Sequence, residues 1–249
     1  QPLETGFVPL LPREMMMARR YRGKTNELLT HYMCNVARYS SALARRPWET
    51  LRVFDPLAGG GTTLFAALML GASVAGVEHN QKDVQTTTAF VRQFAREQNI
   101  PYQESKARFK GVGQRWTFTL GQQKQSCWIA HGDTADAQTL ISGFRPHLIV
   151  GDLPYGIQHK GQLAALLENS LPIWETLLPP SGALVLAWES RRLPRLEMIE
   201  LIQASGTLVI EPVRLSASLA LPTAGGGSGS FWRQPLTRSM RVESEPRTL

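Results

Sequence analysis

The chain has 249 residues, 43% of them hydrophobic, which is enough for one sizeable domain with a full apolar core. It carries 27 Lys and Arg against 20 Asp and Glu, a formal net charge of +7. This balance favours a polyanionic partner, because phosphate groups bind clustered basic side chains. The arginines gather at Arg19, Arg20 and Arg22, at Arg45 and Arg46, and at Arg191, Arg192 and Arg195.

Several classes of protein are excluded at this stage. The sequence has no apolar run long enough for a transmembrane helix, and residues 1–11 lack the pattern of a signal peptide. Cys34 and Cys127 have no Cys or His partner at metal-ligand spacing, so no metal site is predicted. Two isolated thiols are typical of a reducing cytoplasm. The chain begins at Gln1 rather than Met, which suggests that a segment precedes it.

Helices and strands are predicted to alternate along most of the chain. The predicted helices span 26–46, 62–70, 82–98, 134–141, 163–178 and 194–204. The predicted strands span 51–55, 73–78, 126–131, 147–151, 183–188, 207–213 and 231–242. Residues 99–125 are polar and aperiodic, which indicates a loop-rich insertion with a hairpin around 116–120. Residues 216–230 are rich in Ser, Ala and Gly and are expected to form a flexible loop, either native or an engineered linker.

This alternation predicts an α/β fold of the Rossmann-like type. We expect a seven-stranded, mostly parallel sheet with an antiparallel last strand and helices on both faces. Residues 1–46 are expected to form an N-terminal segment and helix that pack on a main domain of residues 47–249.

The turn after the first strand is the strongest single motif. That strand ends in Asp55, and Gly59-Gly60-Gly61 precede a helix that begins at Thr62. Glycines let a ligand approach the backbone, and the first turn of a helix offers unpaired N–H groups. The run lacks the spacing of a dinucleotide or phosphate loop, and a plain turn is the alternative. Glu78 ends the second strand, where it can accept hydrogen bonds from ribose hydroxyls. Asp133 follows the third strand and can accept from an adenine amino group or cap the next helix.

A second motif, Asp152-Leu153-Pro154-Tyr155-Gly156, follows the fourth strand. An exocyclic amine of a nucleic-acid base is a poor nucleophile, because its lone pair is delocalised into the ring. The carboxylate of Asp152 and the carbonyl of Leu153 can accept the amine hydrogens and so turn the lone pair toward a methyl donor. Pro154 stiffens the loop, and Tyr155 offers a ring on which the base can stack. A simple turn is the alternative.

These motifs resemble those of a known group of enzymes. Residues 55–62 resemble the cofactor motif of class I S-adenosylmethionine-dependent methyltransferases. Residues 152–156 are similar to the Asp/Asn-Pro-Pro-Tyr motif of nucleic-acid amino methyltransferases, and Leu153 matches a variant found in tRNA guanine-N2 methyltransferases. Residues 22–26 resemble the segment that closes over the methionine end of the cofactor. Members of this family carry a THUMP domain that grips tRNA, and no such domain precedes the motifs in this chain.

The resemblance implies S-adenosylmethionine as cofactor and methyl transfer to an exocyclic amino group, with guanine-N2 in tRNA or another RNA as the first expectation. The alternatives are DNA adenine-N6 or cytosine-N4 methylation, methylation of a protein glutamine or small amine, and an inactive nucleic-acid-binding module or partner subunit. In the absence of a THUMP domain, a homodimer or an accessory subunit is expected to supply substrate recognition. The candidate catalytic residues are Asp152, Leu153, Pro154 and Tyr155. The candidate cofactor-binding residues are Thr25, Asp55, Pro56, Ala58, Gly59, Gly61, Thr62, Thr63, Glu78, His79, Asp133 and Asp152.

Overall fold

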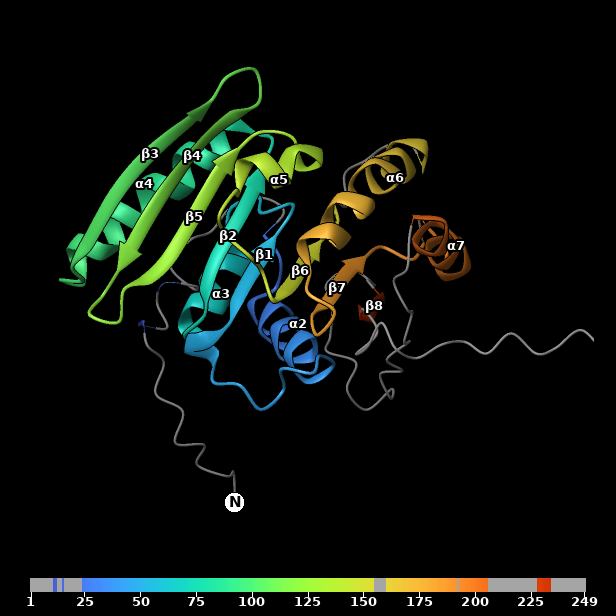
Figure 1. The fold of residues 1–249 in the computed structure, drawn as a ribbon, viewed down its shortest axis with the longest axis horizontal. Coiled ribbons are helices and arrows are strands. Elements are labelled where there is room, and N and C mark those ends of the chain that lie inside the picture. The colour runs from blue at the N-terminus through green and yellow to red at the C-terminus, as the bar shows by residue number, and fades with distance from the viewer. Residues whose placement is uncertain are drawn as a thin grey trace, which may run out of the picture.

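A mixed β-sheet forms the centre of the molecule (Figure 1). The computed structural model describes residues 11–12, 15, 24–154, 160–191, 193–205 and 228–233. The strands of these residues are β1 (Arg52–Asp55), β2 (Ser73–Glu78), β3 (Tyr102–Phe109), β4 (Gly113–Leu120), β5 (Gln125–His131), β6 (Leu148–Asp152), β7 (Ala183–Trp188) and β8 (Ser228–Arg233). Their order in the sheet is β3-β4-β5-β2-β1-β6-β7-β8.

The central part of the sheet is parallel and its two ends are antiparallel. Strands β5, β2, β1, β6 and β7 run in one direction, whereas β4 is antiparallel to β5, and β8 is antiparallel to β7. This confirms the predicted α/β class, the mostly parallel sheet and the antiparallel last strand. The described sheet has eight strands where seven were predicted, because β3 and β4 form within the predicted loop-rich insertion. β8 begins at Ser228, inside the predicted loop of 216–230. The rest of that loop, the predicted strand at 207–213 and residues 234–242 lie outside the described residues.

Helices cover both faces of the sheet. They are α2 (Glu27–Tyr39), α3 (Thr62–Leu70), α4 (Gln81–Glu97), α5 (Ala137–Leu140), α6 (Lys160–Leu177) and α7 (Arg195–Ser205), with short 3₁₀ turns η1 (Trp48–Thr50) and η2 (Thr134–Asp136). Successive strand residues point to opposite faces, so Val53 packs into a core with α2, α3 and α4, and Phe54 into a core with α5, α6 and α7. None of the helices among the described residues is long and apolar enough to cross a membrane.

The predicted first helix is shorter than expected. It was predicted to reach Arg46, but α2 ends at Tyr39 with Ser40 as its C-cap. The Ser41 hydroxyl donates to the Arg38 carbonyl at 2.7 Å and accepts from the Leu43 amide at 3.1 Å. Such side-chain bonds to the backbone compete with continuation of a helix. The residues up to Arg46 therefore form turns.

The predicted loop-rich insertion at 99–125 is wrong. Strands β3 and β4 form a long antiparallel hairpin that extends the sheet beyond β5, and α4 lies behind it (Figure 1). In β4 every second residue from Trp116 to Leu120 is buried. In β3 most residues from Gln103 to Arg108 are exposed, because β3 is an edge strand held chiefly by its backbone bonds to β4. An edge strand of this kind has no apolar stripe by which the sequence could reveal it.

Candidate active site

A cavity of about 580 Å³ opens at the carboxyl ends of β1, β2, β5 and β6. Ligands of open α/β sheets bind at this edge. The volume lies within the range of sites for small molecules and cofactors. Residues from the glycine-rich turn, from the ends of the strands and from the segment before α2 all line it.

The glycine-rich turn joins β1 to α3 and presents its backbone to the cavity. The Ala58 amide donates to the Val77 carbonyl at 2.9 Å, which ties the turn to β2, and the Gly61 amide donates to the Ala58 carbonyl at 2.7 Å. Gly59 and Gly61 have φ angles of 48° and 87°, in the left-handed region that favours glycine. A Cβ at Gly59 would meet no atom within 4 Å. The turn therefore leaves open space next to its backbone where a ligand can lie.

Glu78 joins the turn to the end of β2. One of its carboxylate oxygens accepts from the Gly59 amide at 2.8 Å and the other accepts from the Asn80 amide at 2.6 Å. These two bonds fix the carboxylate at the edge of the cavity. Each carboxylate oxygen has two lone pairs, so Glu78 can accept further hydrogen bonds from a ligand.

Asp55 lies beneath the turn and is only 2% exposed. One of its oxygens accepts from the Leu57 amide at 3.0 Å. Burial raises the pKa of Asp55 to about 7, hydrogen bonds from Leu57 and Thr63 oppose this shift, and repulsion from Asp152 and Glu78 adds to it. The cavity therefore gathers three acids whose negative charges disfavour one another.

Asp152 is the last residue of β6 and forms a hydrogen bond with a residue near the N-terminus. The Thr25 hydroxyl donates to Asp152 Oδ2 at 2.6 Å, across 127 positions of the chain. Next to it, the Leu153 amide donates to the Ala187 carbonyl at 2.8 Å, and the Leu153 side chain is 1% exposed in the core. Pro154 is exposed at the cavity, and Tyr155 lies outside the described residues. The start of this loop is therefore anchored on β7 and in the core.

Asp133 follows β5 and caps the next helical turn. Its carboxylate accepts from the Ala135 amide at 2.8 Å, so the capping alternative is confirmed. The residue also lines the cavity, which leaves the predicted contact with an adenine amino group as a prediction. The neighbouring Thr134 hydroxyl accepts from Trp174 Nε1 at 3.0 Å and so connects this edge to α6.

Most of the predicted site residues meet at the one cavity. Those that line it are Thr25, Asp55, Pro56, Ala58, Gly59, Thr62, Thr63, Glu78, His79, Asp133, Asp152, Leu153 and Pro154. Gly61 does not line the cavity and instead caps α3. Their assigned roles in binding and catalysis stay predictions.

Other lining residues were missed by the sequence analysis. They are Leu57, Val77, Gly132, Thr134 and Leu166. Four of them lie next to a residue that the motifs did single out. Leu166 belongs to α6, which packs against η2, and no sequence signal identifies it.

Metal binding has no support among the described residues, which contain no group of three or more His, Cys, Asp or Glu that could hold an ion. Cys34 and Cys127 are buried, and burial raises the pKa of each thiol to about 12. Both cysteines therefore pack as small apolar residues.

Comparisons with known proteins relate the chain to others through its fold. No family model matches the sequence, and no curated protein matches it. Its structure is similar to TrmN from Thermus thermophilus, with a TM-score of 0.55 and 18% identity over 86% of this chain. It is also similar to a protein from Listeria monocytogenes named as a class I S-adenosylmethionine-dependent methyltransferase, with a TM-score of 0.53 and 11% identity over 90% of this chain.

The chain spans only part of both proteins, 50% of TrmN and 62% of the Listeria protein. At these identities the likeness shows the fold, which is the Rossmann-like fold of class I methyltransferases. The name of the Listeria protein agrees with the cofactor that the sequence predicts.

Proposed function

We propose that this chain transfers a methyl group from S-adenosylmethionine to an exocyclic amino group of a nucleic-acid base, with guanine-N2 in tRNA or another RNA as the first candidate. One observation carries the proposal. The glycine-rich turn with its two acids, Asp55 and Glu78, lines the same cavity as Asp152, Leu153 and Pro154. A cofactor site and a loop suited to an amine are thus adjacent.

The residues present fit the adenosine part of the cofactor. The Glu78 carboxylate is held by two backbone amides and keeps lone pairs for the ribose hydroxyls. The open space beside Gly59 allows the ligand to approach the backbone. Asp133, at the end of β5, is exposed to the same cavity and can accept from the adenine amino group.

The charge of the cavity also fits. Burial is the main reason that the pKa of Asp55 is raised, and repulsion from Asp152 and Glu78 adds to it. A cation bound among them would relieve this repulsion. The cofactor, when bound, supplies a positively charged sulfonium that carries the reactive methyl group.

Asp152 is suited to position an amine substrate. The Thr25 hydroxyl binds Oδ2 and so limits rotation of the carboxylate. A carboxylate accepts at about four lone-pair positions, so this bond leaves Asp152 able to accept the amine hydrogens. Accepting them favours a more tetrahedral nitrogen whose lone pair points at the methyl group. After transfer, the same carboxylate can take up the proton that the amine must lose.

RNA is favoured over DNA by the sequence of the loop. Leu153 stands where the resemblance to the guanine-N2 enzymes places Leu, Met or Ile. Its side chain is buried in the core, so it supports the loop, and only its backbone is suited to meet the base. DNA adenine-N6 or cytosine-N4 methylation uses the same arrangement and remains the second candidate.

The test is methyl transfer from labelled cofactor to total tRNA, rRNA, DNA and protein, followed by digestion and identification of the labelled product. We expect labelled N2-methylguanosine from an RNA fraction. Asp152→Asn keeps the shape of the side chain and should lower the single-turnover rate by about 10²–10⁴. Its cofactor affinity, measured by calorimetry, should fall far less than the rate, because Asp55 and the Glu78 carboxylate remain in the cavity. Label in protein alone, or a near-normal rate in Asp152→Asn, would contradict the proposal.

A further inference from the structure

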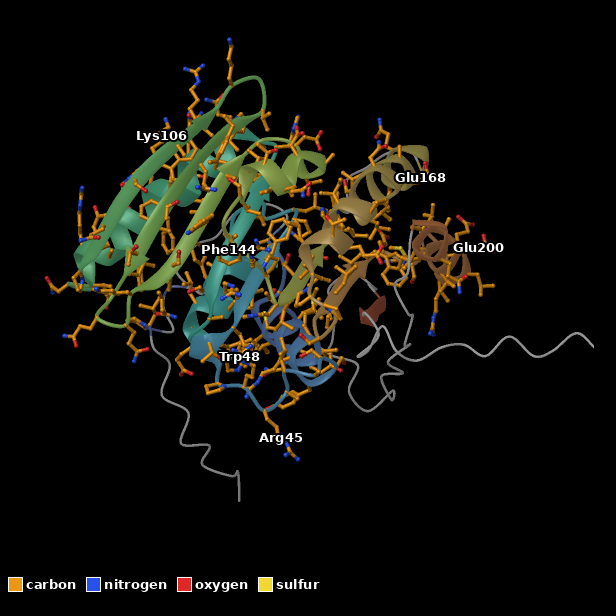
Figure 2. The ribbon with its side chains drawn as sticks, viewed as in Figure 1. Arg45, Trp48, Lys106, Phe144, Glu168 and Glu200 are labelled. Atoms are coloured by element: carbon orange, nitrogen blue, oxygen red, sulfur yellow. The ribbon has the colours of Figure 1, made fainter. Side chains whose placement is uncertain are left out.

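The edge of the sheet opposite the cavity carries arginines from three separate segments. Arg45 and Arg46 lie in the turns between α2 and η1, Arg52 begins β1, and Arg145 precedes β6. Because β1 and β6 are parallel neighbours, their first residues lie at the same edge. We call these four residues the arginine edge. Figure 2 shows Arg45 reaching outward at the lower end of the molecule, with Trp48 just inside it.

Contacts join Arg52 of the arginine edge to the segment of Arg145 and His147. Arg52 Nε donates to the Arg145 carbonyl, and Arg52 Nη2 lies 3.1 Å from His147 Nε2. The His147 amide in turn donates to the Arg52 carbonyl at 2.8 Å. Burial lowers the pKa of Arg52, and repulsion from Arg46 and Arg145 lowers it further. Arg46, Arg52 and Arg145 are therefore close enough for their charges to repel.

The described acidic side chains do not neutralise this charge. Arg45, Arg46 and Arg145 are exposed, and none of them forms an ion pair within the described part of the chain. Glu49, the one acid between residues 45 and 52, is also exposed and makes no ion pair there. Burial, with repulsion from Arg52 and Arg46, lowers the pKa of His147 to about 4, so this histidine is neutral at pH 7. Unpaired cations held close together favour an anion between them.

An exposed aromatic ring lies beside the arginine edge. Tyr39, at the end of α2, is 65% exposed. The Arg38 guanidinium lies over the rings of both Tyr39 and Trp48, 5.4 Å and 5.1 Å from their centroids. Exposed aromatic rings among arginines are typical of surfaces that bind nucleic acids, since the rings stack on bases and guanidinium groups bind phosphates in pairs of hydrogen bonds.

We propose that the arginine edge binds the phosphodiester backbone of the nucleic-acid substrate at a second site, apart from the cavity. That the partner is a nucleic acid rests on the proposed function, but the residues of the arginine edge are separate from those of the cavity. A polyanion at this edge relieves the repulsion among the arginines, which the acidic side chains that the structure describes leave in place. The edge thus supplies affinity that does not depend on base sequence, while the cavity selects the reacting base.

The test compares two triple variants that remove the same charge. Arg45→Ala/Arg46→Ala/Arg145→Ala removes the exposed cations of the edge and leaves Arg52, which contacts the Arg145 carbonyl and His147. Lys106→Ala/Arg108→Ala/Lys110→Ala removes three exposed cations from the β3–β4 hairpin. Fluorescence anisotropy with labelled tRNA, and with labelled single-stranded DNA of matched length, is measured over a series of salt concentrations.

The edge variant should bind both probes at least about tenfold more weakly. The slope of log affinity against log salt should fall by about 2, at roughly 0.7 per lost phosphate contact on a single strand. The hairpin variant should show a clearly smaller loss of affinity and a clearly smaller change in the salt slope. Urea unfolding verifies that each variant is folded. If the triple edge variant does not fold, Arg45→Ala/Arg46→Ala replaces it, and about two thirds of the change in slope is then expected.

Two results would overturn the inference. The first is an equal loss of affinity in both triple variants, which would mean that net charge alone drives binding. The second is unchanged affinity in the edge variant. The methyl-transfer assay, run on the same variants, separates the inference from the proposed function, since the arginine edge is tested by binding alone. If no nucleic acid accepts a methyl group but the edge variant alone loses binding, the arginine edge stands and the proposed activity falls.

Discussion

Thr25→Val removes the hydroxyl that donates to Asp152 Oδ2 at 2.6 Å and keeps the shape of the side chain. The bond joins a segment ahead of α2 to the end of β6, so it holds the proposed catalytic carboxylate from outside its own loop. If Asp152 acts by position, loss of this bond should slow methyl transfer more than it weakens cofactor binding.

The size of the effect follows from the geometry. A length of 2.6 Å is typical of a hydroxyl that donates to an ionised carboxylate. A hydrogen bond to a charged group is worth about 1.5–3 kcal/mol, which corresponds to roughly 10–100-fold in rate. The bond is only partly buried, so water can replace the hydroxyl in part. We therefore expect a decrease of about tenfold.

The assay is single-turnover transfer at saturating cofactor, with cofactor affinity measured in parallel by calorimetry. Thr25→Ser is the matched control, because it keeps the hydroxyl and removes only a methyl group. It should retain most of the rate. A Thr25→Val enzyme that transfers at the normal rate but binds the cofactor weakly would refute the reasoning, and Thr25 would then act on the cofactor alone.

Three further predictions test the cofactor turn. Glu78→Ala should weaken S-adenosylmethionine binding by about 1.5–3 kcal/mol for each lost ribose bond, and unchanged affinity in calorimetry would remove Glu78 from the site. The pKa of Asp55 is raised from 3.8 to about 7 in the folded protein. The folded state therefore binds the proton more tightly than the unfolded state, and the free energy of unfolding should decrease by a few kcal/mol as pH rises from about 4 to about 7. Urea unfolding of Asp55→Asn should lack this fall, and parallel pH profiles for both proteins would contradict the raised pKa. Gly76→Ala places a Cβ 2.7 Å from the Ala58 Cβ and should cost about 1–3 kcal/mol of unfolding free energy. Gly161→Ala meets no atom within 4 Å in a helix and should stabilise by up to about 1 kcal/mol, so a loss of equal size in both variants would refute the packing argument.

The elements that the sequence predicted best are those with strong local signals. β2, α3 and β7 have the predicted bounds, because each is a short apolar run that is almost wholly buried. α3 is also delimited by Gly61 and Gly71, both in the left-handed conformation. A hairpin was predicted around 116–120, but the strand β3 escaped prediction, because it is polar, mostly exposed and paired on one side only, with β4.

The sequence by itself determined the chemistry that the site can offer. Alternating strands and helices imply a parallel sheet, and a parallel sheet brings the acids that follow its strands to one edge. Asp55, Glu78, Asp133 and Asp152 could therefore be assigned to one cavity from their positions alone, and the structure places them there.

Only the tertiary structure decided how these groups interact. Burial beneath the turn raises the pKa of Asp55, and packing brings Thr25 within hydrogen-bond distance of Asp152. The arginine edge likewise joins Arg46, Arg52 and Arg145, which no local motif connects. The physical reason is the same in each case. Local propensity acts over a few neighbouring residues, whereas desolvation, repulsion and hydrogen bonding depend on distances that are fixed only when remote segments pack together.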